Sequence, residues 1–239
     1  MPPHSPLPSS PGAAGLPPDR PWSFSLLDAY ELCPKKYDAE KRSKTVAELS
    51  NEKQQYGTYA HKCFELRMRR GAKLPLDMTH HEPMLQQLCD YPGEKLTEQR
   101  MALTRDLKPT GFFDSDVWVR GLADLLIVNE KQHKLVAVDY KFGRMKDSFD
   151  QLDLMVAIAF RLVKGLKHAL GLFYWAGDKK FTRKLYDEDS TLRVWENIMP
   201  RVQQFQEAHR TGTFPARPNF LCRKHCPVTG CKYHKVGGR

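Results

Sequence analysis

The sequence contains no run of apolar residues long enough to span a membrane, no internal repeat and no glycine-rich phosphate-binding loop. The missing loop excludes an ATP-driven motor. The first 20 of the 239 residues hold seven prolines and lack the apolar core of a signal peptide, and their single arginine argues against a transit peptide. We expect residues 1–20 to be a disordered tail and residues 21–239 to form one domain.

What the chain has in excess is positive charge. Its 38 lysines and arginines outnumber its 28 acidic residues and give a formal net charge of +10, which favours polyanionic partners. Several basic clusters adjoin aromatic residues, as where Lys36 precedes Tyr37 and Lys180 precedes Phe181. Basic groups bind phosphates and aromatic rings stack on unpaired bases, so we expect single-stranded nucleic acid as a partner.

Two short apolar segments carry polar groups that suit a metal site. Residues 117–128 contain Asp124, residues 135–138 lead into Asp139, and the six polar residues between the segments predict a hairpin turn. Paired strands would bring Asp124 close to Asp139, and Lys141 shares a face with Asp139 because strand side chains alternate. Two carboxylates and a lysine can hold a divalent cation and orient a water beside a phosphodiester, which is nuclease chemistry.

Residues 52–70 have apolar side chains at helical spacing and precede Gly71, which predicts a helix. His61 and Glu65 are four residues apart and share a face of that helix. His61 would complete the metal site as a neutral nitrogen ligand. Glu65 could orient His61 or a metal-bound water, although an ordinary exposed charge fits the pattern equally well.

A second helix is predicted from residue 149, with an apolar stripe along one side. Gln151 falls in its first turn, where it either reaches back to the active site or a phosphate, or simply starts the helix. Further strands are predicted at residues 97–104, 169–175 and 180–186, and a long helix is predicted between a capping Ser190 and Gly212. Together these elements predict an α/β domain with a mixed sheet flanked by helices.

Three of the six cysteines lie within ten residues, which favours a metal site over disulfides in a chain without a secretory signal. Cys222, Cys226 and Cys231 need a fourth ligand. His234 would complete a tetrahedral zinc site, with His225 as another donor. Cys33, directly before Pro34, is the other candidate.

The order of these motifs resembles the RecB-type branch of the PD-(D/E)XK nucleases, which includes the CRISPR adaptation nucleases and many phage-encoded exonucleases. The motifs are a helix with G-x3-H at His61, a strand with G-x2-D at Asp124, a strand with D-x-K at Asp139, and a helix that opens with Gln151. Residues 23–37 are similar to the N-terminal signature of the branch. The resemblance therefore covers residues 22–234.

This resemblance implies a restriction-endonuclease-like fold and a set of residue roles. The implied ligands of Mg²⁺ or Mn²⁺ are His61, Asp124, Asp139 and the carbonyl oxygen of Tyr140. Lys141 would position the attacking water, and Gln151 would join the catalytic group. Glu98 matches an acidic position before the first core strand. Two positions depart from the usual pattern, since Asp139 stands where glutamate is commoner and Met155 where tyrosine is frequent.

The resemblance also implies a [4Fe–4S] cluster that joins the N- and C-terminal segments. Its ligands would be Cys33, Cys222, Cys226 and Cys231. Structural zinc remains the alternative, because the cysteine spacing differs from the C-x2-C-x5-C of the CRISPR nucleases.

From these features we predict a metal-dependent deoxyribonuclease. An exonuclease acting on single-stranded or end-processed DNA, in recombination, repair or replication, is the first choice. A non-catalytic DNA-binding or adaptor module and an RNA nuclease are the alternatives, although a binding module has no reason to keep His61, Asp124, Asp139 and Lys141 together. We expect a soluble, cytoplasmic protein of a bacterial cell or phage-infected host, without membrane attachment and with recombination or replication proteins as further partners.

Overall fold

One strand, β3 (Val119–Asn129), organises the sheet because it pairs with three others. The antiparallel strand β2 (Glu94–Leu103) follows one edge of β3 along most of its length. The opposite edge is shared by β1 (Trp22–Ser23), which is parallel to β3, and β4 (Lys134–Lys141), which is antiparallel. The structure, a computed structural model, describes residues 20–48, 52–145 and 147–236, so the predicted tail lies outside the described residues except for residue 20.

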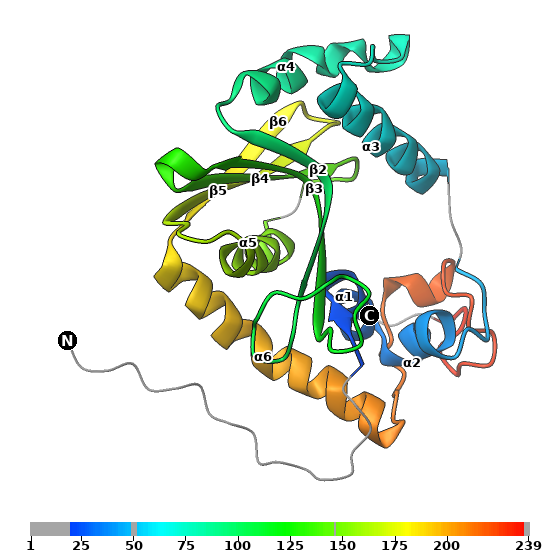
Figure 1. Cartoon of the computed structure of the whole chain (residues 1–239). Helices are drawn as coiled ribbons and strands as arrows, with labels where there is room; N and C mark the ends of the chain where they lie inside the picture. Colours follow the sequence, from blue (N-terminus) through cyan, green and yellow to red (C-terminus); the bar gives the residue numbers. More distant parts are fainter. Residues whose placement is uncertain (1–19, 49–51, 146, 237–239) are drawn as a thin grey trace.

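The sheet continues beyond β4 and carries helices on both faces (Figure 1). β5 (His168–Trp175) is parallel to β4, and β6 (Lys180–Tyr186) is antiparallel to β5. One face is covered by α1 (Phe24–Leu32), α5 (Asp150–Leu162) and α6 (Glu188–Thr211). The other face is covered by α3 (Glu52–Arg70) and α4 (Glu82–Asp90), which follows the 3-10 turn Leu76–His81.

The sheet forks where β4 leaves β3. On their shared edge, β1 pairs with Val119 and Arg120, and β4 pairs with β3 only from Leu125 onward. The last β3–β4 pair joins Leu125 to Val138, after which β4 stays paired with β5 alone. Residues 121–124 of β3 therefore have no strand partner on this edge among the described residues, and an open crevice forms there.

The alternation of side chains slips at the same place. Ala123 packs into the core under α5, whereas Leu125, two residues later, packs into the core under α3. Residues two apart in a regular strand lie on the same face. The slip coincides in β2 with Glu98, which lies between Thr97 and Gln99, the partners of Leu125 and Ala123. Glu98 has a left-handed φ of 49°. Such a backbone is uncommon outside glycine and is costly, which marks Glu98 as a residue with a constrained position.

The segments after α1 and after α6 meet beside α1. After Cys33, the short helix α2 (Pro34–Tyr37) leads into a π-helical turn, Asp38–Arg42, and the segment that follows α6 returns across α2 to the 3-10 turn Phe220–Arg223 (Figure 1). The amide of Lys35 donates to the carbonyl of Pro215 at 3.2 Å. The predicted junction of the N- and C-terminal segments is thus present as a packing arrangement.

The predicted fold class is confirmed, whereas the cap of one helix and the ends of some elements were wrong. Residues 129–134 form the predicted hairpin turn, with the 3-10 turn Glu130–Gln132 and a left-handed His133. The cap of α6 is Asp187 rather than Ser190, because each side chain accepts a hydrogen bond from the other's backbone amide in a capping box. β2 runs from Glu94 to Leu103 rather than from residue 97 to 104. β5 begins at His168 rather than at residue 169, and α5 begins at Asp150 rather than at residue 149. None of the described helices is long and apolar enough to cross a membrane.

The packing of α5 on the sheet predicts the effect of one substitution. A Cβ atom on Gly171 of β5 would lie 2.8 Å from Leu152 Cδ2 and 2.9 Å from the Tyr186 ring. Gly171→Ala should therefore lower the free energy of unfolding by about 1–3 kcal/mol through overpacking, measured by urea denaturation. Gly177→Ala is the control, since nothing lies within 4 Å of a Cβ there. Equal unfolding midpoints for the two variants would contradict this packing.

Candidate active site

The fork places two carboxylates at the point where β3 and β4 separate. Asp124 ends the unpaired stretch of β3, and Asp139 is the first residue of β4 beyond its pairing with β3. The backbone amide of Tyr140 donates to Asp124 Oδ2 at 2.7 Å, so a side chain takes the place of the missing ladder partner. The separation of the strands thus exposes Asp124 while holding it in one orientation.

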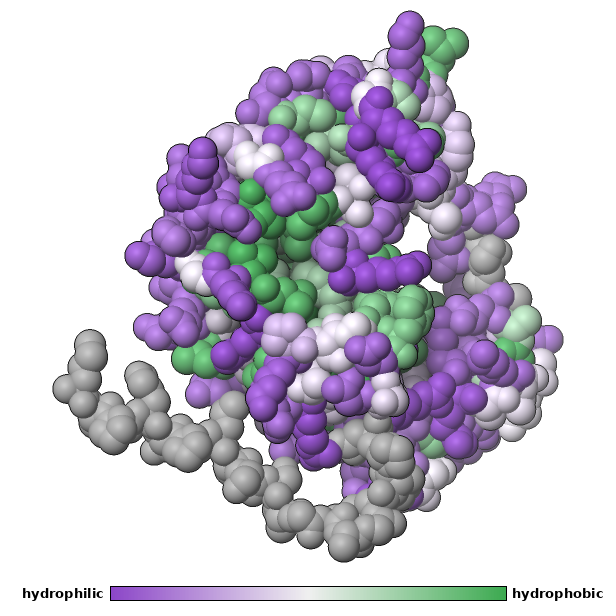
Figure 2. Space-filling view, in the orientation of Figure 1, coloured by the Kyte–Doolittle hydropathy of each residue, from purple (hydrophilic) through white to green (hydrophobic). Residues whose placement is uncertain are grey.

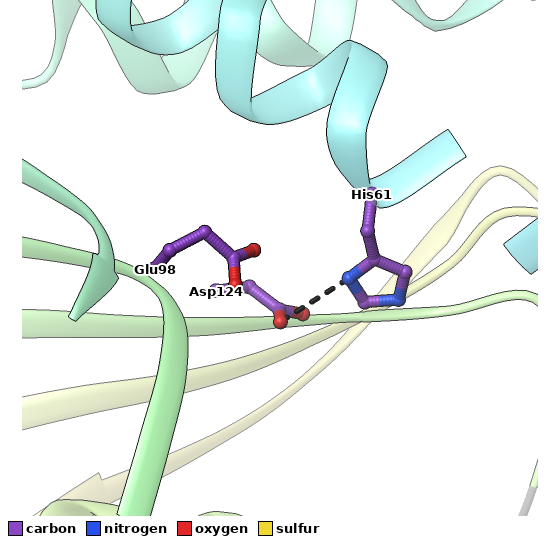
Figure 3. Close-up of side chains that lie close together, drawn as sticks. All are labelled: His61, Glu98 and Asp124. Carbon is purple, nitrogen blue, oxygen red and sulfur yellow. Dashed lines mark ion pairs between the residues drawn. The ribbon is translucent and has the colours of Figure 1, made fainter. Parts of the chain in front are cut away.

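A first group of ligands gathers on the α3 side of the fork. His61, Glu98 and Asp124 each offer one ligand atom, and these three atoms lie within 4.8 Å of one another. The His61 imidazole reaches from α3 towards the two strand carboxylates, and its Nδ1 lies 3.2 Å from Asp124 Oδ1 (Figure 3). One nitrogen and two carboxylates suit Mn²⁺ or Mg²⁺.

A second group lies on the α5 side. Asp139 is only 4% exposed. Lys141 Nζ lies 2.6 Å from Asp139 Oδ2 and forms an ion pair with it, although the angles do not fit a hydrogen bond. The Gln151 amide bridges the two residues, because its nitrogen donates to Asp139 Oδ1 at 2.8 Å and its oxygen accepts from Lys141 Nζ at 2.7 Å. The opposite charges of these partners fix the orientation of the amide.

The electrostatics of the fork favour a bound cation. Burial and the charge of Asp124 raise the pKa of Asp139 to about 6, although Lys141 lowers it. Burial and Asp124 likewise raise the pKa of Glu98. Burial lowers the pKa of His61, but the carboxylates of Asp124, Asp139 and Glu98 raise it above its ordinary value. Carboxylates that repel one another in a buried place become more stable beside a divalent cation, so the donor set fits Mg²⁺ or Mn²⁺.

The two groups open into one cleft of about 1360 Å³. The start of α1, the N-terminal half of α3, strands β2 to β4 and the first turns of α5 line it. The space-filling view shows the molecule hollowed between the part that contains α3 and the part that contains α1 and α2 (Figure 2). A polymer can therefore reach the fork from solvent.

The structure brings most of the sequence-predicted residues to the fork and leaves others elsewhere. Those at the fork are His61, Glu98, Asp124, Asp139, Lys141 and Gln151. Glu65 lines the same cleft, but its carboxylate pairs with Lys62 at 2.5 Å and Arg69 at 3.6 Å rather than with His61. The Tyr140 ring is buried in the core under α3, and only its backbone faces Asp124. Sequence reasoning missed Phe112 and Arg120, which also line the cleft; the position of Arg120 directly before the G-x2-D motif was the one available signal.

The four cysteines of the predicted cluster lie away from the fork, one directly after α1 and three in the C-terminal segment. Cys33 and Cys222 are buried, and Cys226 and Cys231 are half-buried. Burial raises the pKa of Cys226, and the neighbouring thiols of Cys222 and Cys33 raise it further. Cys33 of the N-terminal segment therefore lies close to the C-terminal cysteines, 189 positions along the chain from Cys222 (222 − 33).

A forked mixed sheet with a histidine, paired carboxylates and an Asp-x-Lys sequence at the fork defines a class of metal-dependent phosphodiesterases. A family model of the PD-(D/E)XK nuclease superfamily matches residues 21–231, and the chain belongs to that superfamily. It is a metal-dependent nuclease of restriction-endonuclease-like fold, and members of the superfamily use Mg²⁺ or Mn²⁺.

Comparisons with individual proteins add little to the family assignment. A solved structure described as "Crystal structure of SSO0001" aligns with a TM-score of 0.43 and 14% identity, over 90% of this chain and 86% of that chain. No curated protein matches the sequence.

The geometry of the first group predicts that Glu98 contributes to metal affinity. Glu98→Gln removes one negative charge from the three convergent ligands, so Mn²⁺ should bind at least tenfold more weakly, measured by isothermal titration calorimetry. Glu94→Gln on the same strand is the matched control, because Glu94 is exposed and outside the group. Equal Mn²⁺ affinities for the two variants would remove Glu98 from the site.

Proposed function

We propose that this nuclease degrades DNA, acting as an exonuclease on single-stranded or end-processed strands in recombination, repair or replication. The observation that carries the proposal is the junction of the two groups at the fork, where His61, Glu98 and Asp124 face Asp139, Lys141 and Gln151. A net charge of +10 and a cleft with basic and aromatic walls support a nucleic-acid strand as the substrate.

The ligands of the catalytic cation are His61, Asp124 and Asp139 in this proposal, with Glu98 and the carbonyl oxygen of Tyr140 completing the set. When bound, Mg²⁺ or Mn²⁺ supplies Lewis acidity towards the phosphate and lowers the pKa of a water. The Tyr140 amide holds Asp124 in place, and the Gln151 amide does the same for Asp139. Both carboxylates are thus oriented before substrate arrives, which avoids reorganisation during the reaction.

Lys141 is the cation that offsets negative charge developing on the scissile phosphate. Its ammonium is fixed by Asp139 and by the oxygen of Gln151. An ammonium has three donors, so it can hold these partners and still donate to a water or a phosphate oxygen. Gln151 is a positioning residue in this arrangement, because it touches the two charged groups rather than the reacting atoms. A non-catalytic adaptor would have no use for so constrained a lysine.

Asp139→Asn tests the carboxylate. The substitution keeps the shape of the side chain and removes its charge, so cleavage of end-labelled DNA in Mn²⁺ should fall by at least a hundredfold. DNA binding, measured by fluorescence anisotropy, should stay within about twofold because lysines and arginines dominate it. Asp147→Asn is the control, because Asp147 is exposed and does not line the cleft. Cleavage at the wild-type rate, either in this variant or in EDTA, would refute the proposal.

Lys141→Ala separates turnover from metal binding. The variant should bind Mn²⁺ at least as tightly as the wild type, since it loses a competing positive charge beside Asp139. Its kcat should fall by at least tenfold with little change in KM, because the lost interaction forms mainly in the transition state. A rise in KM with unchanged kcat would instead make Lys141 a phosphate anchor.

We further propose that Cys33, Cys222, Cys226 and Cys231 hold a [4Fe–4S] cluster that ties the chain ends together. Two of these thiols accept backbone N–H donors, Cys33 from Arg217 at 3.5 Å and Cys222 from Asn219 at 3.4 Å, as cluster thiolates do. Zinc is the alternative, with His234 as the fourth ligand beside Cys222, Cys226 and Cys231.

Anaerobic purification tests the cluster. The protein should be brown, with broad absorption near ~400 nm and about four iron atoms per chain, and Cys33→Ser should abolish the colour. Cys63→Ser is the control, because Cys63 lies on α3 in the other core. A colourless protein with about one zinc per chain, lost on His234→Ala but kept in Cys33→Ser, would establish the zinc alternative.

A further inference from the structure

The loop between β2 and β3 presents two phenylalanines beside the cleft. The amide of Asp114 donates to the carbonyl of Gly111 at 3.1 Å, which closes a turn with Phe112 and Phe113 at its centre. Phe112 lines the cleft, whereas the Phe113 side chain is 74% exposed. Their rings lie 5.2 Å apart, edge to face. An aromatic ring exposed to this degree contributes little to the stability of the fold.

The loop is nevertheless firmly built. The Asp114 carboxylate accepts from the Gly111 amide at 2.8 Å and from the Thr110 hydroxyl at 3.1 Å. At the base of the loop, the backbone amide of Thr110 donates to the carbonyl of Ala102 at 3.2 Å. The backbone amide of Trp118 donates to the carbonyl of Leu103 at 2.9 Å. The exposed ring is therefore held in place before any partner arrives, which lowers the entropy cost of binding to it.

Two arginines flank the rings. The Arg100 guanidinium lies 5.2 Å from the centre of the Phe113 ring and 5.7 Å from that of Phe112, and Arg120 lies 5.4 Å from Phe112. Arg120 Nε also donates to the Phe112 carbonyl at 2.8 Å. A guanidinium has five N–H donors, so Arg120 can make this bond and still bind a phosphate.

A continuous strip joins these arginines to the fork. Every second residue of β3 from Arg120 to Asp124 lines the cleft, namely Arg120, Leu122 and Asp124. The Leu122 side chain is 50% exposed. On β2, Arg100 pairs with Leu122. At a strand rise of about 3.3 Å per residue, the Cα atom of Arg120 lies about 13 Å from that of Asp124. The strip thus runs from carboxylates, through an apolar floor, to guanidinium groups and an exposed aromatic ring.

We propose that Phe113 is a stacking platform for an unpaired base of the strand whose phosphate is cleaved at the fork, with Arg100 and Arg120 binding the adjoining phosphates. This inference rests on the proposed nuclease function and adds the residue that recognises an unpaired strand. Unpaired bases expose their faces to aromatic rings, whereas the bases inside a duplex are already stacked on one another. The positive charge beside the ring suits a polyanion and disfavours a basic protein partner.

Binding measurements in the Asp139→Asn background, where the strand is not cut, test the platform. Phe113→Ala should weaken binding of a fluorescein-labelled single-stranded 20-mer about 5- to 150-fold, the range for loss of one stacked base. The same variant should bind a 20-mer of abasic nucleotides as the parent does. Phe113→Trp should retain affinity, and Phe113→Leu, which keeps an apolar side chain without a ring, should not. Leu185→Ala is the matched control, being 77% exposed on β6 at the far edge of the sheet.

Three results would overturn the platform. Unchanged affinity of Phe113→Ala for the 20-mer would point to a protein partner at this loop instead. An equal loss on the abasic strand would show that the ring supports backbone contacts rather than stacking. Parent-like binding by Phe113→Leu would mean a plain apolar contact. If the nuclease proposal itself were wrong, the result would differ: the wild-type protein would bind the 20-mer but leave it intact in Mn²⁺.

Discussion

The structure depends on one constraint, the inability of β1 and β4 to pair with the same stretch of β3. Both strands lie on one edge, and between them residues 121–124 of β3 stay unpaired on that edge. The sheet opens there, and the backbone amide of Tyr140 donates to the Asp124 carboxylate instead of to a backbone carbonyl. Because the fork lies between the two helical layers, it can take His61 from α3 on one side and Gln151 from α5 on the other.

The same opening explains the charge distribution. Three carboxylates meet in a partly buried crevice, where burial and, after it, their mutual repulsion raise the pKa values of Glu98 and Asp139. Natural cores rarely keep such an arrangement unless a cation accompanies it. The left-handed backbone of Glu98 and the slip in alternation add local strain, which clusters at functional sites. In this account the fold accepts a local loss of stability at the fork in exchange for a metal site.

Local sequence rules predicted part of the site and missed the rest for physical reasons. Strand alternation alone placed Lys141 beside Asp139, and the hairpin brought Asp139 to Asp124. Alternation failed at Glu98, where the backbone leaves the strand conformation, so its convergence with His61 and Asp124 was visible only in three dimensions. Glu65 shares a helical face with His61 but found nearer partners in Lys62 and Arg69, since ion pairs on one helix need no tertiary contact.

A crystal structure of the protein soaked with Mn²⁺, with anomalous diffraction used to locate the metal, tests the central claim most directly. The account predicts a manganese peak in the fork, at ligand distance from a nitrogen of His61 and from carboxylate oxygens of Asp124 and Asp139, with Lys141 still beside Asp139 and Gln151. A fork without manganese at saturating concentration would contradict it.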